Sequence, residues 1–221
     1  MAVVSQGPND TRETLNRERV LRGAVAFADE HGIETLSMRK LGAALGVEAM
    51  SLYNHVANKD DLLDGIVEQV AIEFEAPADE GDWRTVVRRS AVSQHRVLLQ
   101  HPWVAALSES RVQSGPARLA YYDALLGVYR RAGFSPRAAY RANLTLDSYI
   151  YGFTLQEVSW PEPMDEDGGL ADQFVARTPA DTYANLVEVA RLASDGIDLD
   201  ADFEAGLDAV LDGLERLRDN D

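Results

Sequence analysis

The 221-residue chain contains no cysteine, which excludes disulfide bonds, thiolate metal ligands and thiol catalysis. No apolar run approaches the roughly 20 residues that a membrane-spanning helix needs. The first residues also lack the basic start and the following apolar segment of a signal peptide. These absences favour a cytoplasmic protein without a membrane partner.

Recognisable catalytic motifs are also missing. Two of the four histidines, His95 and His101, are six residues apart, so they do not share one helical face. There is no zinc-protease pattern of two histidines with a glutamate, no phosphate-binding glycine loop and no nucleophile elbow. We therefore expect no enzyme activity, no metal site and no resident cofactor.

Positive charge is scarce and unevenly distributed: 21 Lys and Arg stand against 37 Asp and Glu, for a net charge of −16. Residues 1–59 carry seven basic and seven acidic side chains, whereas residues 60–221 carry 14 basic and 30 acidic ones. A neutral N-terminal segment with local basic points can approach nucleic-acid phosphates while the acidic remainder faces away. We expect a salt dependence set by few phosphate contacts.

The most informative stretch is SMRKLGAALGVEAMSLYNH, residues 37–55. Ser37 can cap a first helix, because its hydroxyl can accept from a free backbone N–H of the first turn. Gly46 can end that helix in the left-handed conformation, which glycine adopts without steric cost. A second helix is predicted from about Ala49 to His55. This is the helix-turn-helix pattern, whose second helix enters the DNA major groove; the alternative is an ordinary pair of packed helices.

The helix-turn-helix geometry gives DNA-contacting roles to the outward side chains. Residues at the start of the first helix, and a lysine beyond the second, would hold phosphates, while small and polar residues of the second helix would read the groove. The predicted DNA-binding residues are Ser37, Met38, Arg39, Ala49, Met50, Ser51, Tyr53, Asn54, His55 and Lys59.

With its flanks, this region resembles the DNA-binding domain of the tetracycline-repressor (TetR) family of transcriptional regulators. Segment 185–217 resembles the C-terminal end of the tetracycline-repressor subgroup. The resemblance implies a homodimeric regulator, most often a repressor, that a small molecule releases from palindromic operator DNA. The residues that carry the N-terminal resemblance are Gly32, Arg39, Leu41, Gly46, Val47, Leu52, Tyr53, His55, Val56, Lys59, Leu62 and Leu63.

We expect an all-α protein of nine or ten helices, because apolar residues recur at helical spacing along the chain. A three-helix domain would precede a larger helical one. The predicted parts are a flexible arm at 1–15, the helix-turn-helix domain at 16–59, a connecting helix at 60–75, and a ligand-binding and dimerisation domain at 76–218. The acidic stretch 160–179, with prolines and a glycine pair, is predicted to be a loop, either at the ligand entrance or as a solvated insertion.

A ligand site is predicted where two polar residues, Ser90 and Gln94, fall on the buried side of one helix. A buried unpaired amide costs on the order of 1–3 kcal/mol, so Gln94 needs a partner, which is either a ligand or a neighbouring backbone group. With nearby aromatic residues, the predicted ligand-binding set is Ser90, Gln94, Tyr122, Tyr149 and Phe153.

The resemblance also bears on the kind of effector. The tetracycline repressor binds its drug as a magnesium complex through histidines, and Gly152 and Ser108 stand at two of the corresponding positions. We therefore expect an apolar or aromatic small molecule, and no metal chelate.

The last predicted helix carries apolar residues in steps of four and three, the spacing of a packing seam. Such a seam suits an internal bundle or a dimer face, and the two-fold symmetry of an operator favours the dimer. The predicted dimerisation residues are Phe203, Leu207, Val210, Leu214 and Leu217. Two other classes stay open: a helical small-molecule binder without DNA activity, and a ligand-independent DNA-binding protein.

Overall fold

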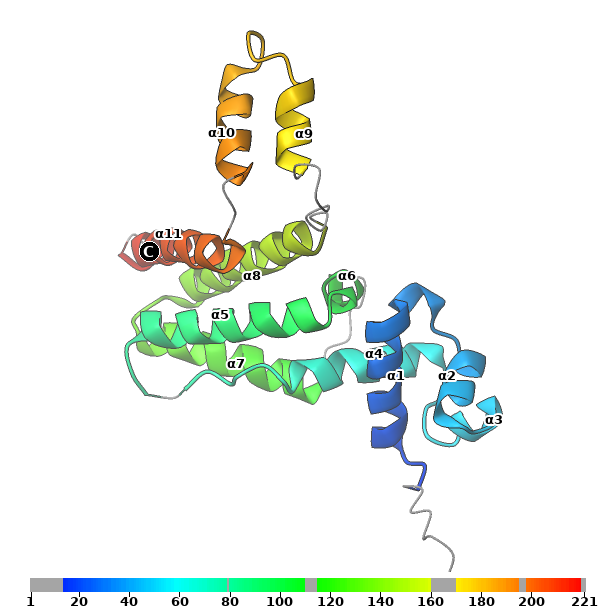
Figure 1. Ribbon diagram of the computed structural model, residues 1–221. Helices are drawn as coiled ribbons and strands as arrows, with labels where there is room; N and C mark the ends of the chain where they lie inside the picture. Colours follow the sequence, from blue (N-terminus) through cyan, green and yellow to red (C-terminus); the bar gives the residue numbers. More distant parts are fainter. Residues whose placement is uncertain (1–13, 79, 110–114, 160–169, 195–197, 220–221) are drawn as a thin grey trace, which may run out of the picture. The chain divides into compact units, whose positions relative to one another are not determined.

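The computed structural model describes residues 14–78, 80–109, 115–159, 170–194 and 198–219. Within these ranges the chain is all-α and contains no strand, as predicted (Figure 1). Its elements are α1 (Arg17–His31), the 3-10 helix η1 (Ile33–Thr35), α2 (Met38–Leu45), α3 (Ala49–Leu52), α4 (Lys59–Ala71), α5 (Trp83–Gln100), α6 (Trp103–Glu109), α7 (Pro116–Arg131), α8 (Pro136–Ser159), α9 (Leu170–Arg177), α10 (Ala184–Ser194) and α11 (Leu199–Asp219).

The chain divides into two compact units, and α4 crosses the boundary between them. The first unit extends to Gln69 and the second begins at Val70. In the first unit, α1 packs on α2 and α2 packs on α3. Its core is built from fully buried aliphatic side chains, because each helix presents one apolar stripe. They are Val20, Ala24, Leu41, Leu52, Leu62 and Ile66.

In the second unit, α5 packs against α6, α7, α8 and α11, and α8 packs in turn against α7 and α11. Asp82 begins α5 by accepting a hydrogen bond from the Thr85 backbone N–H at 3.0 Å. Inward positions of α5 then bury Trp83, Val87 and Leu98. The helix is therefore covered on several sides, and its buried polar residues lie inside the unit.

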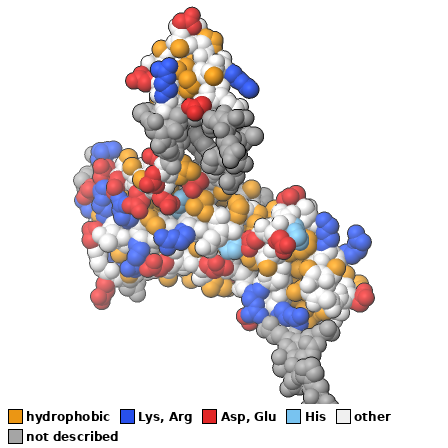
Figure 2. Space-filling model, in the orientation of Figure 1, with side chains coloured by type: hydrophobic (Ala, Val, Ile, Leu, Met, Phe, Trp, Pro, Cys, Tyr) orange, Lys and Arg blue, Asp and Glu red, His pale blue; other side chains and the backbone are white. Residues whose placement is uncertain are grey.

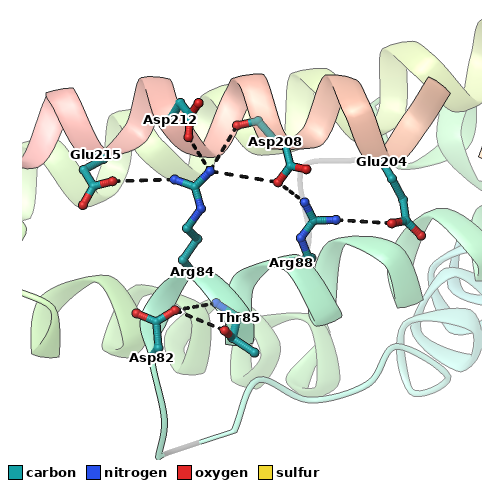
Figure 3. Close-up of polar contacts among 8 residues, drawn as sticks. All are labelled: Asp82, Arg84, Thr85, Arg88, Glu204, Asp208, Asp212 and Glu215. Atoms are coloured by element: carbon teal, nitrogen blue, oxygen red, sulfur yellow. Dashed lines mark hydrogen bonds and ion pairs between the residues drawn. The ribbon is translucent and has the colours of Figure 1, made fainter. Parts of the chain in front are cut away.

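One side of α5 carries two arginines that face a row of carboxylates on α11 (Figure 3). Arg84 contacts three of them and Arg88 contacts two, so the acidic face of α11 is partly neutralised by α5. The measured separations include 3.4 Å from Arg88 Nη1 to the Glu204 carboxylate and 3.6 Å from Arg84 Nη1 to the Glu215 carboxylate. The four carboxylates are Glu204, Asp208, Asp212 and Glu215.

The prediction of a loop over 160–179 is wrong for its second half, where α9 forms. The prolines and the glycine pair of this stretch fall before Leu170 or after Arg177, and the sequence between them, LADQFVAR, contains no helix breaker. Because of this extra helix, the described residues hold eleven α-helices in place of nine or ten. Residues 160–169, like most of the predicted arm at 1–15, lie outside the described residues.

Helices α9 and α10 pack mainly on each other. In Figure 2 their surface shows apolar side chains among charged ones. Four large apolar residues of this hairpin are exposed: Phe174, Tyr183, Leu186 and Val189.

Candidate functional site

The turn between α2 and α3 has the geometry of a helix-turn-helix. Ser37 Oγ accepts from the Lys40 backbone N–H at 3.3 Å, which confirms the predicted cap. Gly46 ends α2 in the left-handed region, with φ 69° and ψ 32°. The Val47 N–H then donates to the Gly42 carbonyl at 2.9 Å and closes the turn.

Helix α3 is shorter than predicted: it ends at Leu52 rather than near His55. Beyond Ser51 the chain tightens into turns, because the Asn54 N–H bonds to the Ser51 carbonyl and the His55 N–H bonds to the Leu52 carbonyl, three residues back in each case. Leu52 and Val56 are buried and anchor both ends of this segment in the core.

The outward face of α3 and of the turn after it is apolar at its centre and polar around it. Met50 is 73% exposed and Tyr53 is 44% exposed. Asn54 is also exposed, while Ala49, Ser51 and His55 are half-buried. A thymine methyl group in the major groove offers the exposed Met50 side chain an apolar contact.

Three exposed basic side chains lie on the helices before and after α3. Arg39 and Lys40 lie at the start of α2, Lys59 begins α4, and all three are exposed. Met38 is different: its side chain is 9% exposed and packs inward. The prediction that Met38 holds a phosphate is therefore wrong for the side chain, because its hydrophobic position next to Leu41 places it in the core.

A second group of polar side chains lies inside the second unit, among α5, α7 and α8. Ser90 and Gln94 are buried, as predicted. The Tyr121 hydroxyl donates to Gln94 Oε1 at 3.4 Å, and the Tyr151 hydroxyl interacts with both Gln94 and Tyr122. Of the predicted ligand-binding residues, Ser90, Gln94 and Tyr122 are thus brought into one cluster.

Sequence reasoning missed Tyr121 and Tyr151, although the first falls one position before the predicted Tyr122 and the second two after Tyr149. Burial is the main cause that raises the pKa of the Tyr121, Tyr122 and Tyr151 hydroxyls, and the charge of Asp147 raises each pKa further. These phenols therefore stay neutral and can donate hydrogen bonds at physiological pH.

The other two predicted ligand-binding residues, Tyr149 and Phe153, lie in a separate aromatic cluster around His95. The Tyr149 hydroxyl donates to the Phe203 carbonyl at 2.7 Å. The His95 ring stacks on the Phe203 ring with centroids 3.8 Å apart, and Phe153 meets His95 edge to face at 5.7 Å. The Tyr149 ring also contacts the rings of Phe153 and Phe203, so this cluster joins α5, α8 and α11.

The hydrogen bonds around His95 assign its tautomer. The Thr154 hydroxyl donates to the Ile150 carbonyl at 2.8 Å, so its oxygen accepts from His95 Nδ1–H at 2.9 Å. His95 Nε2 then faces Glu157 Oε2 at 3.2 Å, and a hydrogen bond between them requires a proton on one of the two. Burial lowers the pKa of His95 and raises the pKa of Glu157, and Asp200 on α11 also raises the pKa of each. The two burial effects therefore both disfavour a fully charged His95–Glu157 pair.

The residues predicted to form a dimer face on α11 differ in burial. Phe203, Leu207 and Leu214 are buried within their own chain, and Val210 and Leu217 are half-buried. The four-and-three spacing does mark a packing seam, but this seam is filled by α5 and α8 of the same chain. Spacing alone could not distinguish an internal seam from one between two chains.

No group of three or more His, Cys, Asp or Glu within the described ranges could hold a metal ion. Every helix in the part of the chain that the structure describes is too short or too polar to cross a bilayer.

Two family models match the chain and correspond to its two units. Residues 20–66 match the bacterial regulatory proteins of the tetR family, and residues 76–218 match the tetracyclin repressor-like C-terminal domain. The second match alone covers more than half of the chain.

Similar proteins of known name agree with these matches. The HTH-type transcriptional repressor DrrR1 of Streptomyces coeruleorubidus is 32% identical over 96% of this chain and 81% of its own. The class A tetracycline repressor of Escherichia coli is 31% identical over 92% of each chain. The crystal structure of the TetR family protein ActR of Streptomyces coelicolor in complex with actinorhodin superposes with a TM-score of 0.77, at 30% identity over 92% of this chain and 98% of that one. Together with the helix-turn-helix geometry, these likenesses show that the chain belongs to the tetR family of bacterial transcriptional regulators.

Proposed function

We propose that the protein is a cytoplasmic repressor that binds palindromic operator DNA as a homodimer and leaves it when a small molecule binds the second unit. The observation that carries this proposal is the exposed face of α3, with Met50 and Tyr53 at its surface and Arg39 and Lys59 on the helices before and after it. A role as an enzyme has no support from the site, since no catalytic group of residues accompanies this face.

The sign of regulation and the response to a ligand are supported by the relatives. DrrR1 and the class A tetracycline repressor are both named as repressors. ActR has been crystallised with actinorhodin, so a chain of this fold accommodates a small molecule. We extend both properties to this protein as part of the proposal.

We place the effector in the cluster of Ser90, Gln94, Tyr121, Tyr122 and Tyr151. Buried amides and phenols need hydrogen-bond partners, and at least one Gln94 amide hydrogen is not used within the described part of the chain. Neutral tyrosines offer aromatic faces and hydroxyl donors together. An aromatic effector with a carbonyl or hydroxyl group matches this lining.

We place the dimer contact on α8. One face of α8 carries exposed apolar residues at spacings of 4, 11 and 3, which keeps them in one row along the helix. Exposed apolar rows of this kind mark contact surfaces. The row consists of Tyr140, Leu144, Leu155 and Val158.

The mechanism follows from the geometry of DNA. Two recognition helices must lie about 34–36 Å apart to enter successive major grooves. An effector that prefers a different spacing of the two heads weakens operator binding by its differential affinity, typically ~1–3 kcal/mol. Helix α4 begins in the first unit and ends in the second, so it is the covalent path for this coupling.

A mobility-shift assay on DNA flanking the protein's own gene tests the DNA-binding part. Tyr53→Ala should weaken specific binding and leave the fold intact, because the side chain is 44% exposed. Tyr183→Ala is the matched control, since it removes an exposed tyrosine from the second unit that lies outside the proposed dimer contact. A helical small-molecule binder without DNA activity would show no specific complex with any of the three proteins.

The ligand-dependent part is tested with Gln94→Phe, which fills the cluster with an apolar ring. The variant should keep operator binding and lose release by effector. A ligand-independent DNA-binding protein would show no release of the wild type by any member of an aromatic compound library, and Gln94→Phe would then change nothing.

A further inference from the structure

A polar network in the first unit joins α1 and α4 to the segment that follows the recognition helix. Arg17 is the first residue of α1. Its guanidinium donates two hydrogen bonds, of 2.9 Å and 2.6 Å, to the carboxylate of Asp61 on α4. The same Nη1 donates to the His55 carbonyl at 3.0 Å. Asp61 Oδ2 also accepts from the Ala57 backbone N–H at 2.7 Å. The pair thus ties the backbone at 55–57 to both α1 and α4.

The segment at 55–57 directly follows α3, and α3 needs external support. A helix of four residues, Ala49–Leu52, has almost no internal hydrogen bonds to fix its direction. Leu52 and Val56 anchor the inner face of this segment in the core. Apolar packing is non-directional, whereas a two-bonded guanidinium–carboxylate pair has a fixed planar geometry.

We propose that Arg17 and Asp61 are positioning residues, which form a clamp that fixes the recognition helix in the orientation needed to read its operator. This inference rests on the proposed DNA binding. An arginine in the DNA-binding unit could instead contact a DNA phosphate directly. The clamp gives Arg17 a different role. Both Nη1 hydrogens are used, one by Asp61 and one by His55, so this nitrogen is committed to the protein.

The charge state of the pair agrees with a permanent clamp. The hydrogen bond from Arg17 is the main cause that holds the pKa of Asp61 below its ordinary value. The Ala57 N–H lowers it further. The carboxylate is therefore ionised at physiological pH, where regulators bind DNA.

Asp61→Asn separates the clamp from a phosphate contact, because the two predict opposite signs. If Arg17 binds a phosphate, Asp61→Asn frees it and removes a negative charge, so DNA binding stays equal or becomes tighter. If the pair is a clamp, the amide of asparagine turns a donor toward the guanidinium and the 55–57 segment loosens. Specific binding then weakens although the electrostatic change favours DNA.

Glu18→Gln is the matched control. Glu18 accepts from Arg22 at 2.9 Å in an exposed pair four residues apart within α1. The change removes the same charge from the same unit, and the hydrogen bond that it alters joins two residues of α1.

The experiment measures fluorescence anisotropy of full-length wild type, Asp61→Asn, Arg17→Lys and Glu18→Gln on an operator selected by the wild type, and on a scrambled duplex. For Asp61→Asn and Arg17→Lys we expect operator binding about tenfold weaker or more, since charge-assisted two-bonded pairs are the strong ones. Scrambled-DNA binding and the salt slope should match the wild type. Glu18→Gln should bind the operator like the wild type. The amide resonance of Ala57 in a ¹⁵N spectrum should move in both clamp variants while most other resonances of the first unit stay in place.

Operator binding by Asp61→Asn that equals or exceeds that of Glu18→Gln would overturn the clamp. A lower salt slope in Arg17→Lys with unchanged sequence preference would do the same. Widespread loss of first-unit resonances in both clamp variants would show a general stabilising pair and also reject a positioning role. A wild type that selects no operator would instead reject the proposed function, and the clamp with it.

Discussion

The left-handed conformation of Gly46 predicts that one methyl group weakens the DNA-binding unit without any clash. A Cβ added at Gly46 meets no atom within 4 Å, yet its φ is +69°. A side chain in the left-handed region costs roughly 1–2 kcal/mol. Gly46→Ala should therefore lower the free energy of unfolding of the first unit by about 1 kcal/mol or more, and also weaken operator binding, because this turn sets the start of α3.

Gly152→Ala is the matched comparison. Its added Cβ also meets nothing within 4 Å, but Gly152 lies inside α8 with no positive φ. Alanine is favoured over glycine in a helix interior by roughly 0.5–1 kcal/mol, so this variant should be slightly more stable. The two identical substitutions should thus differ by about 2 kcal/mol.

Urea unfolding followed by far-ultraviolet circular dichroism measures both variants against the wild type. Equal effects of the two substitutions would refute the reasoning, since the conformation of the glycine is the only local difference used. A destabilised Gly46→Ala with unchanged operator affinity would leave the stability argument intact but contradict the role of the turn in placing α3.

Three further predictions concern DNA, pH and assembly. Lys59→Gln should lower the salt slope of operator binding by about 1.8 for a dimer, at about 0.9 per lost phosphate contact, whereas Arg96→Gln on the exposed side of α5 should leave the slope unchanged. The raised pKa of Glu157 stabilises the fold below the ordinary value of 4.5, and this contribution is lost as pH rises through the folded-state pKa. Glu157→Gln removes this titration, so unfolding between pH 5 and 8.5 should show that its stability relative to the wild type rises with pH; a constant difference would contradict the raised pKa of Glu157. Leu144→Glu should shift the protein toward monomers in sedimentation velocity, since burying each leucine contributes roughly 1.5–3 kcal/mol. The control Leu119→Glu on α7 should leave the protein dimeric. Equal behaviour of the two variants would place the dimer contact elsewhere.

Much of the first unit could be predicted from sequence because its signals are local. Ser37 and Gly46 act on the backbone within a few residues, and Leu52 is buried by a spacing that the sequence shows directly. Local signals also have limits. The end of α3 depends on turn hydrogen bonds beyond Ser51, so its length was overestimated. The clamp of Arg17 and Asp61 joins residues 44 positions apart, and no local pattern indicates it.

The second unit was less predictable because its contacts are distant in sequence. Gln94 was correctly expected to be buried, but its partners Tyr121 and Tyr151 come from two other helices. Tyr149 and Phe153 share an aromatic character with those partners and were therefore grouped with them. The structure places them against His95 and Phe203 instead. Which aromatic residue meets which polar one depends on helix crossing geometry, and a single sequence does not contain it.

The seam on α11 shows the same limit in another form. Leu207 and Leu214 lie on one stripe, as their spacing indicates, and they are fully buried. The stripe is covered by helices of the same chain, and the exposed apolar row lies on α8. A packing seam in a sequence therefore predicts burial reliably, but it does not predict which chain supplies the cover.

The central claim is that the first unit reads a specific operator as half of a two-fold dimer. Selection of bound sites from a pool of random duplex DNA tests it most directly. The account predicts a palindromic site whose half-site centres are about 34–36 Å apart or a multiple of that distance, and Tyr53→Ala should fail to enrich it. Recovery of no specific sequence by the folded wild-type protein would contradict the claim, and the second unit would then be the functional part of a small-molecule-binding protein.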